Sequence, residues 1–260
     1  MDLGLSGKWA LVTGASQGIG EGLAKTFAAE GVNLHLAARS GDKLQQVKDE
    51  LAKAFPVETC IHPLDIAKPG ACEQLAAACG DIDILVNNAG TIPSGSLFDI
   101  DEQKWREGWE LKVFGYINLC RLIYPQMKAR GGGVIINNIG NGGEVFDPQY
   151  IAGTTGNASL MAFTRALGGH SLDDNVRVIG VNPGPVDTDR IYNMLKKRAK
   201  TLFGDESRYK ELEGRYPLGR PARVQEITDL IAFLASYRSG YTSGAIFTVD
   251  GGIASRRSII

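Results

Sequence analysis

Short runs of apolar and β-branched residues alternate with stretches of helical periodicity along the whole chain. Seven strands are predicted, near Trp9–Thr13, Val32–Ala38, Val57–His62, Ile82–Val86, Val134–Ile139, Val176–Val181 and Ala245–Val249. Six helices are predicted, near Gly18–Glu30, Asp42–Ala54, Gly70–Cys79, Asp101–Arg130, Asn157–Ser171 and Arg223–Tyr237. Strands that alternate with helices are typical of βαβ units, so we expect an α/β fold with a doubly wound, seven-stranded parallel sheet. Helices should cover both faces of this sheet.

One segment interrupts this alternation. The stretch from Asp187 to Pro217 contains no predicted strand and carries many charges, among them Lys196-Lys197-Arg198. It follows the sixth strand, and doubly wound sheets bind their ligands beyond the carboxyl ends of the strands. We therefore expect a substrate lid inserted near residues 188–217 of a single domain that spans residues 1–260. The alternative is a solvated charged helix.

Composition narrows the classes of function. A hydrophobic content of 43% suits a sizeable core, and a net charge of −1 provides no global attraction to nucleic acid or to an anionic membrane. The four cysteines lack C-x-x-C spacing and the three histidines are scattered, so we expect no metal and buried free thiols. The absence of an apolar targeting segment or membrane span predicts a cytoplasmic protein.

A glycine-rich turn joins the first predicted strand to the first predicted helix. Gly14, Gly18 and Gly20 are spaced G-x-x-x-G-x-G. Glycines permit a tight turn, and they let backbone N–H groups approach a pyrophosphate at the N-terminus of a helix. Because this turn follows a strand and opens a helix, it predicts a dinucleotide-binding site.

Polar motifs stand at the ends of four further predicted strands. They are Asp65-Ile66, Asn87-Asn88-Ala89-Gly90, Asn182–Thr188 and Thr248–Gly252. The carboxyl ends of parallel strands lie at one edge of a sheet, so these motifs should border one crevice. The motifs T-G-x-x-x-G-x-G, N-N-A-G and P-G-x-V-x-T, in this order and spacing, closely resemble the short-chain dehydrogenase/reductase family over almost the whole chain.

The resemblance implies a Rossmann-like fold, a nicotinamide cofactor and a homodimer or homotetramer paired through the helices near Asp101–Arg130 and Asn157–Ser171. In this reading the glycine-rich turn holds the pyrophosphate, Asp65 hydrogen-bonds to the adenine, and Asn88 lines the ribose path. Residues 183–188 border the nicotinamide carboxamide. A loop that ties strands together is a second reading of Asn87 and Asn88, and both can hold at once. The cofactor-binding residues are thus Gly14, Ser16, Gln17, Gly18, Ile19, Gly20, Arg39, Asp65, Ile66, Asn88, Ala89, Gly90, Pro183, Gly184, Val186 and Thr188.

The end of the second predicted strand bears on the choice of cofactor. Ala38 stands where relatives that prefer NAD usually carry Asp, and Arg39 follows it. A guanidinium suits a 2′-phosphate, so we expect NADP(H) to be favoured over NAD(H). Gln17 stands where many relatives that use NADP carry Lys or Arg. The alternative for Arg39 is a surface arginine that starts a loop.

The catalytic residues that the resemblance implies are Asn, Ser, Tyr and Lys, with the Tyr as general acid/base and the Lys as the cation that tunes it. The stretch Phe163–Leu167 matches the helix after the Tyr–Lys pair, which places the Lys position at Asn157 and the Tyr position at Gly153. The preceding strand places the Ser position at Gly140, and the Asn position falls at Lys112. All four residue types are therefore replaced.

The first hypothesis is an oxidoreductase with a rearranged site. Lys112 would supply the missing cation, and Tyr150 would be the proton donor. Asn141, Thr154 or Asn157 would hydrogen-bond to the substrate. Each main candidate has a structural alternative, since Lys112 could be an interface lysine and Tyr150 a packed aromatic residue.

Two other hypotheses remain. One is a cofactor-binding protein without redox turnover, with a regulatory or structural role. The other keeps hydride transfer to an activated double bond and takes the proton from substrate or water. In that case Lys196-Lys197-Arg198 and Arg190 would meet an anionic substrate. The fold favours an enzyme that acts on a small carbonyl, alcohol or activated double-bond substrate, which could be anionic.

Overall fold

Seven parallel strands form one sheet in the order β3-β2-β1-β4-β5-β6-β7, in a computed structural model that describes residues 1–256. The predicted doubly wound α/β fold is confirmed. The strand order reverses between β1 and β4, where doubly wound sheets open a crevice for ligands. The strands are β1 (Trp9–Thr13), β2 (Asn33–Ala38), β3 (Thr59–Pro63), β4 (Ile84–Asn87), β5 (Gly133–Asn138), β6 (Val176–Pro183) and β7 (Ile246–Val249).

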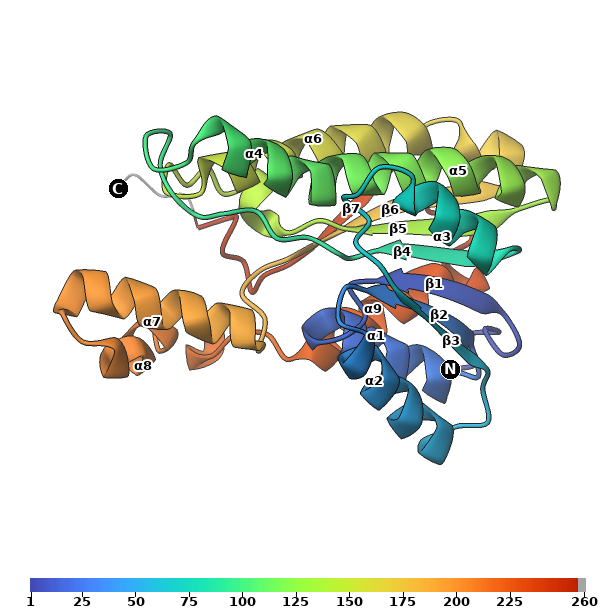
Figure 1. Ribbon diagram of the computed structural model, residues 1–260, viewed down its shortest axis with the longest axis horizontal. Coiled ribbons are helices and arrows are strands. Elements are labelled where there is room, and N and C mark those ends of the chain that lie inside the picture. Colours follow the sequence, from blue (N-terminus) through green and yellow to red (C-terminus); the bar gives the residue numbers. More distant parts are fainter. Residues whose placement is uncertain (257–260) are drawn as a thin grey trace.

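Helices cover both faces of the sheet (Figure 1). One face carries α3, α4, α5 and α6, and the other carries α1, α2 and α9, while α7 and α8 project from one end. Among residues 1–256, none of the helices is both long and apolar enough to cross a bilayer. The helices are α1 (Gly18–Ala29), α2 (Gly41–Ala54), α3 (Ala71–Cys79), α4 (Glu102–Trp109), α5 (Gly115–Ala129), α6 (Ile151–Gly168), α7 (Asp189–Phe203), α8 (Tyr209–Glu213) and α9 (Val224–Ala235).

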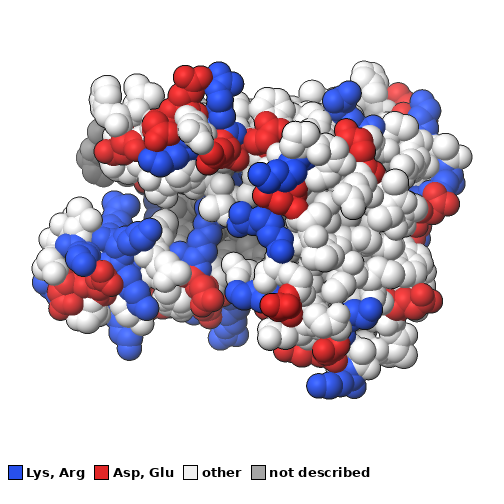
Figure 2. Space-filling view, in the orientation of Figure 1, with Lys and Arg blue, Asp and Glu red and all other residues white. Residues whose placement is uncertain are grey.

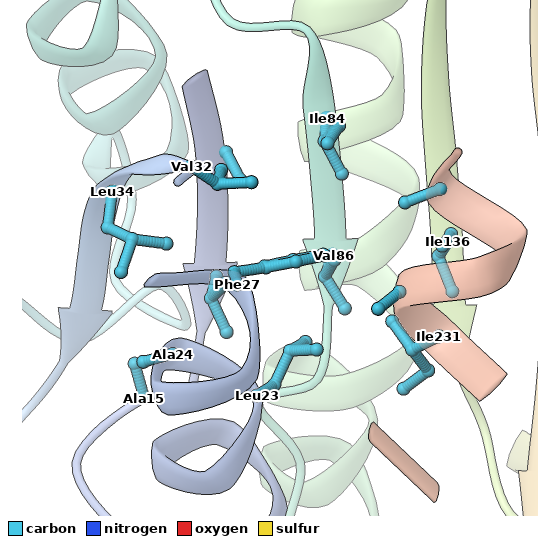
Figure 3. Packing of buried hydrophobic residues seen from close by; sticks show 14 of the residues in the cluster. Ala15, Leu23, Ala24, Phe27, Val32, Leu34, Ile84, Val86, Ile136 and Ile231 are labelled. Atoms are coloured by element: carbon cyan, nitrogen blue, oxygen red, sulfur yellow. The ribbon is translucent and has the colours of Figure 1, made fainter. Parts of the chain in front are cut away.

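The alternation of side chains along β1 explains why both faces of the sheet are buried. Val12 points into the cluster formed with α1 and α9, whereas Leu11 points into the cluster formed with α3 and α5. In the first cluster, Phe27 of α1 packs beside Val86 and close to Ile231 of α9 (Figure 3). This core fixes the carboxyl ends of β1, β4 and β5, which carry the predicted site.

Helix α6 begins at Ile151, although the sequence predicts its start near Asn157. Glycine and threonine between these residues indicate a loop by propensity, but tertiary packing decides the outcome here. A Cβ at Gly156 would lie 3.1 Å from Ile92 Cδ1 and 3.2 Å from Trp109 Nε1. The glycine therefore lets α6 lie close to α4 as a regular helix.

The predicted helix over Asp101–Arg130 is interrupted by a π-helical turn over Glu110–Phe114, between α4 and α5. Lys112 lies in this turn and is buried. Single π-turns inside helices are frequent at functional sites. The interruption therefore marks the place where a candidate catalytic residue enters the structure.

Arg177 of β6 is buried and closes the C-terminal end of α9. Its guanidinium donates hydrogen bonds to the carbonyl oxygens of Leu234, Ala235, Ser236 and Ser239 at 2.6 to 3.1 Å. The last carbonyls of a helix have no partner within the helix, so this side chain satisfies acceptors that would otherwise be buried unpaired.

Replacing Arg177 with Met is expected to lower the free energy of unfolding by about 3 kcal/mol, because it leaves several buried carbonyls without a donor. Urea denaturation followed by circular dichroism measures this change. Lys53 is exposed on α2, so Lys53→Met is the control and should leave the midpoint unchanged. Equal midpoints for the two variants would contradict the capping role.

Candidate cofactor and active site

The glycine-rich turn between β1 and α1 has the backbone that only glycine adopts readily. Gly14 and Gly18 have φ values of 68° and 60°. A Cβ at Gly14 would lie 2.9 Å from Ala89 Cα, and a Cβ at Gly20 would overlap the carbonyl oxygen of Gly14. The turn therefore packs its own backbone tightly against the end of β4, as a phosphate-binding loop requires.

The N-terminus of α1 is open toward this turn. Gln17 is its N-cap residue, and its side chain makes no capping hydrogen bond. The N–H groups of the first helical turn therefore remain available to an anion. Ser16 and Ile19 lie half-buried on either side of Gln17.

Two cations follow β2, and one of them reaches this open end. Arg39 is exposed directly after β2, and Lys43 is exposed in the first turn of α2. Lys43 Nζ donates a hydrogen bond to Gln17 Oε1 at 2.9 Å. The side chain of Lys43 therefore places a positive charge next to position 17, although Gln17 itself is uncharged. Sequence reasoning missed Lys43 because it belongs to the following helix.

Asn88 ties three strands together. Its Nδ2 donates to the carbonyl oxygen of Thr13 at 2.9 Å, and its Oδ1 accepts from Asn138 Nδ2 at 2.8 Å. Thr13 Oγ1 accepts from the backbone N–H groups of Asn88 and Ala89 at 2.9 and 3.0 Å. The structural reading of Asn88 is therefore confirmed, and the residue stands at the crevice between β1 and β4.

The remaining predicted cofactor residues lie at neighbouring strand ends. After β3, Asp65 Oδ1 accepts from the N–H of Ala67 at 3.1 Å, and Ile66 is buried against Gly115 of α5. After β6, the N–H of Gly184 donates to the carbonyl oxygen of Val249 at 3.0 Å. These residues share one edge of the sheet with the glycine-rich turn.

The segment Pro183–Thr188 connects the crevice to α7. Val186 is buried, and Thr188 Oγ1 donates to its carbonyl oxygen at 3.2 Å. A Cβ at Gly18 would lie 3.2 Å from Thr188 Cγ2, so this segment reaches the glycine-rich turn. Thr188 is also the N-cap residue of α7, so the predicted lid begins directly at the cofactor crevice.

Lys112 is a buried cation behind the end of β5. The side chain is 6% exposed, and Nζ donates a hydrogen bond to the carbonyl oxygen of Ile139. Gly90 covers its aliphatic part, since a Cβ at Gly90 would lie 2.7 Å from Lys112 Cδ. Burial, reinforced by the charge of Arg190, lowers the pKa of Lys112 to about 7. The amine can therefore gain and lose a proton near neutral pH.

Tyr150 lies at the N-terminus of α6, and its ring covers Gly153. A Cβ at Gly153 would overlap the ring at Cζ. Arg190 Nη2 donates to the phenol oxygen at 3.3 Å, and Arg190 Nη1 donates to the carbonyl oxygen of Gly90 at 3.3 Å. Because Gly90 also covers Lys112, these contacts join the phenol, the guanidinium and the amine in one cluster.

Asn157 completes this cluster, whereas Asn141 turns away from it. Asn157 is 3% exposed, and its Oδ1 has no hydrogen-bond partner among residues 1–256. A Cβ at Gly142 would lie 3.1 Å from Asn157 Nδ2 and 3.2 Å from Tyr150 Cε1. Asn141 Nδ2 donates instead to Asp250 Oδ2 at 3.1 Å. The structure therefore brings Lys112, Tyr150 and Asn157 together. Asn141 instead contacts Asp250, which follows β7.

The predicted lid, near residues 188–217, contains α7 and α8. It has a hydrophobic cluster of its own, in which Ile191 and Leu195 pack with Leu212. Figure 2 shows a hollow between this segment and the rest of the molecule, with Lys and Arg side chains along it. Arg190 extends from the first turn of α7 to Tyr150, so the segment contributes a cation to the site as well as a charged surface.

Two expectations about cysteine and histidine are wrong. Cys60 is exposed, whereas the other three cysteines are buried. His35 and His62 are not scattered, because the parallel pairing of β2 with β3 brings their rings within 5.1 Å between centroids. Their nitrogens lie near Cys79 at the end of α3. The signal in the sequence is that both histidines lie in adjacent predicted strands, but strand register is a tertiary property.

Comparisons with known proteins agree with this geometry. The family pattern described as enoyl-(acyl carrier protein) reductase matches residues 14–254. Oxidoreductase UcpA of Salmonella typhimurium is 34% identical over 254 residues, which cover 95% of each chain. The structure of L-sorbose reductase from Gluconobacter frateurii, complexed with NADPH and L-sorbose, is 34% identical with a TM-score of 0.91 and covers 99% of this chain and 100% of that one.

The comparisons also include a neighbour that holds the other cofactor. The structure of 7α-hydroxysteroid dehydrogenase, complexed with NADH and 7-oxo glycochenodeoxycholic acid, is 28% identical with a TM-score of 0.85. It covers 96% of this chain and 96% of that chain. Neighbours of this fold thus bind either nicotinamide cofactor.

Proposed function

Since the chain belongs to the short-chain dehydrogenase/reductase family of oxidoreductases, we propose that it transfers a hydride between NADP(H) and a small carbonyl or alcohol compound. In this proposal Lys112 and Tyr150 take the place of the family's usual Tyr–Lys pair. The observation that carries it is the cluster in which a buried amine, a phenol and the guanidinium of Arg190 meet at the end of β5. Such a group of convergent polar side chains, with a lowered pKa at Lys112, beside a cofactor crevice is typical of an active site.

The residues at the crevice fit a dinucleotide. Gly14, Gly18 and Gly20 leave room for a pyrophosphate at the open end of α1, where side chains would fill the space. Asp65 would hold the adenine, and residues 183–188 would border the nicotinamide carboxamide. When bound, the cofactor would supply or accept the hydride.

Side chains of this protein would carry out the proton transfer. During carbonyl reduction, the oxygen of the substrate gains negative charge and takes the proton of the Tyr150 phenol. Arg190, which donates to that phenol oxygen, would stabilise the charge left on it. Lys112 would supply the positive field behind the site. Asn157 Oδ1, which lacks a partner among residues 1–256, would accept a hydrogen bond from a substrate or ribose hydroxyl.

The cations at the site also favour one class of substrate. Arg190 and Lys112 are two positive groups at one site, and further Lys and Arg side chains line the hollow beside α7. A small polar carbonyl compound with a carboxylate would complement this charge. L-sorbose, the ligand of the structural neighbour, is an uncharged comparison.

The alternative is a cofactor-binding protein without turnover. It is favoured by the residues at the implied Tyr and Lys positions, because neither Gly153 nor Asn157 can donate a proton as an acid. The test is NADPH binding by nicotinamide fluorescence, followed by NADPH oxidation with a ketose, an uncharged diketone and a keto acid. Turnover that is lost in a Lys112→Met variant would support the enzyme. Tight binding without any turnover across the set would favour the alternative.

The cofactor preference is tested at Arg39. The Arg39→Ala variant is expected to bind NADPH about 10- to 100-fold more weakly, because a charge-assisted hydrogen bond to the 2′-phosphate is lost. NADH affinity should not change, since NADH carries a hydroxyl at that place. Dissociation constants from nicotinamide fluorescence measure both, and Lys53→Ala on exposed α2 is the control. An equal loss for both cofactors would demote Arg39 to a general surface charge.

We also propose a homodimer or homotetramer, located in the cytoplasm and paired through α4–α5 and α6. Phe114 in the π-helical turn is 45% exposed within the chain, and Phe163 of α6 is half-buried. Apolar side chains left at such helix faces are typical of an interface between subunits. Light scattering on the purified protein should give the mass of two or four chains, and a monomer would contradict the proposal.

A further inference from the structure

A second cluster of reactive side chains lies at the β3 edge of the sheet. His35 of β2 and His62 of β3 face the same side of the sheet, toward Cys79 at the C-terminal end of α3. His35 Nδ1 lies 2.9 Å from His62 Nε2, and Cys79 Sγ lies 3.9 Å from His62 Nε2. The cluster shares no residue with the cofactor crevice or with the Lys112 site.

These separations are close to those of a tetrahedral metal site. Zinc binds histidine nitrogen at about 2.0 Å and cysteine sulfur at about 2.3 Å, so tetrahedral ligands lie about 3.3 Å (N to N) and about 3.5 Å (N to S) apart. In this protein the three ligand atoms of His35, His62 and Cys79 all lie within 4.8 Å of one another. Two of the three separations differ from the tetrahedral values by about 0.4 Å, and the third, up to 4.8 Å, would shorten by about 1 Å through side-chain rotation to bring the two nitrogens and the sulfur around one ion.

Cys60 lies outside this group of three and is the candidate for a fourth ligand. It lies on β3 two residues before His62, on the same face of the strand, and it pairs in register with His35. Its thiol is exposed, and it is near enough to Cys79 to raise the pKa of that thiol electrostatically. Two histidines and two cysteines form one of the usual ligand sets of structural zinc.

The surroundings suit such a site. The ring of Trp9 lies 4.8 Å from the ring of His35 between centroids, which gives the cluster an apolar wall. His35 and Cys79 are buried, so these ligand atoms are shielded from bulk water.

We propose that His35, Cys60, His62 and Cys79 bind one divalent transition-metal ion of borderline softness, for which Zn²⁺ is the natural candidate. On binding, each thiol releases its proton to solvent and forms a sulfur–metal bond, and each imidazole donates the lone pair of one nitrogen. No ligand position is left for a substrate, so the site is structural. It fastens the edge strand β3 to α3.

Cobalt(II) is the probe for this proposal, because thiolate ligation gives it a charge-transfer absorption and tetrahedral geometry gives it intense visible bands. Protein stripped with a chelator should take up one Co²⁺ per chain with both signatures, and Zn²⁺ should displace it. The variants His62→Gln and Cys79→Ser should each lower the affinity by more than about 100-fold, since loss of a supporting residue alone costs about 10- to 100-fold. Zn²⁺ should raise the Tm of the unaltered chain more than that of either variant.

Cys72→Ser is the matched control, because Cys72 is a buried free thiol of the same helix outside the cluster. It should leave Co²⁺ binding unchanged, and circular dichroism should confirm that every variant is folded. Absence of the charge-transfer band, or an unchanged Co²⁺ affinity in Cys79→Ser, would overturn the site. Unchanged affinity in Cys60→Ser would overturn the assignment of Cys60 alone. None of these measurements depends on turnover, so they stand apart from the proposed oxidoreductase activity.

Discussion

Replacing Lys112 with Met is expected to lower kcat/KM for carbonyl reduction by about 100- to 1,000-fold, the usual cost of removing one preorganised electrostatic group from an active site. Methionine keeps the length and most of the volume of the side chain, so the buried space stays filled. What disappears is the positive charge next to the carbonyl oxygen of Ile139 and near Arg190. NADPH affinity, measured by fluorescence, should persist because Lys112 lies outside the residues predicted to hold the cofactor.

The pH dependence provides a second readout of the same residue. The pKa of Lys112 is lowered from 10.5 to about 7, so the amine is charged below pH 7 and neutral above it. Reduction, which needs the cation, should decline as the pH rises through 7. This inflection should vanish in Lys112→Met and persist in Lys53→Met. A profile that is identical in all three proteins would exclude Lys112 from the mechanism.

The sequence was sufficient to predict the strand, turn and helix at the proposed cofactor site because these signals are local. Gly14, Gly18 and Gly20 lie within one turn, with the predicted strand before them and the predicted helix after them. The sheet follows from the alternation of short apolar runs and helical stretches, which needs no knowledge of distant contacts. For this part of the chain, the predictions differ from the structure in where helices and strands begin and end.

The catalytic half depends on contacts that no local pattern contains. Lys112 could be named from its position, but its low pKa comes from a π-helical turn and from Arg190 of α7, seventy-eight residues away. The early start of α6 was missed because Gly153 and Gly156 indicate a loop until Tyr150 and α4 pack against them. The cluster around His35 was also missed, because it depends on the register between β2 and β3, which no local pattern contains.

Replacing Tyr150 with Phe is expected to lower kcat by about 100- to 10,000-fold, because the phenol is the proposed proton donor. Phenylalanine keeps the ring that covers Gly153, so the packing of α6 is preserved. The hydrogen bond from Arg190 is the other contact that is lost. Steady-state kinetics of NADPH oxidation measure the change. Tyr241→Phe is the matched control, since Tyr241 is 97% exposed and should leave kcat unaltered.

A second variant tests position while keeping the phenol. In Gly153→Ala the new Cβ would overlap the ring of Tyr150, so the ring must move off the helix. A fall in kcat in both variants would show that the phenol must occupy the space beside Gly153. That requirement would explain why this chain has a glycine at the position where the family resemblance implies a tyrosine. Loss in Gly153→Ala alone would instead indicate a disturbed α6. Full kcat in Tyr150→Phe would remove the phenol from the mechanism and leave substrate or water as the source of the proton.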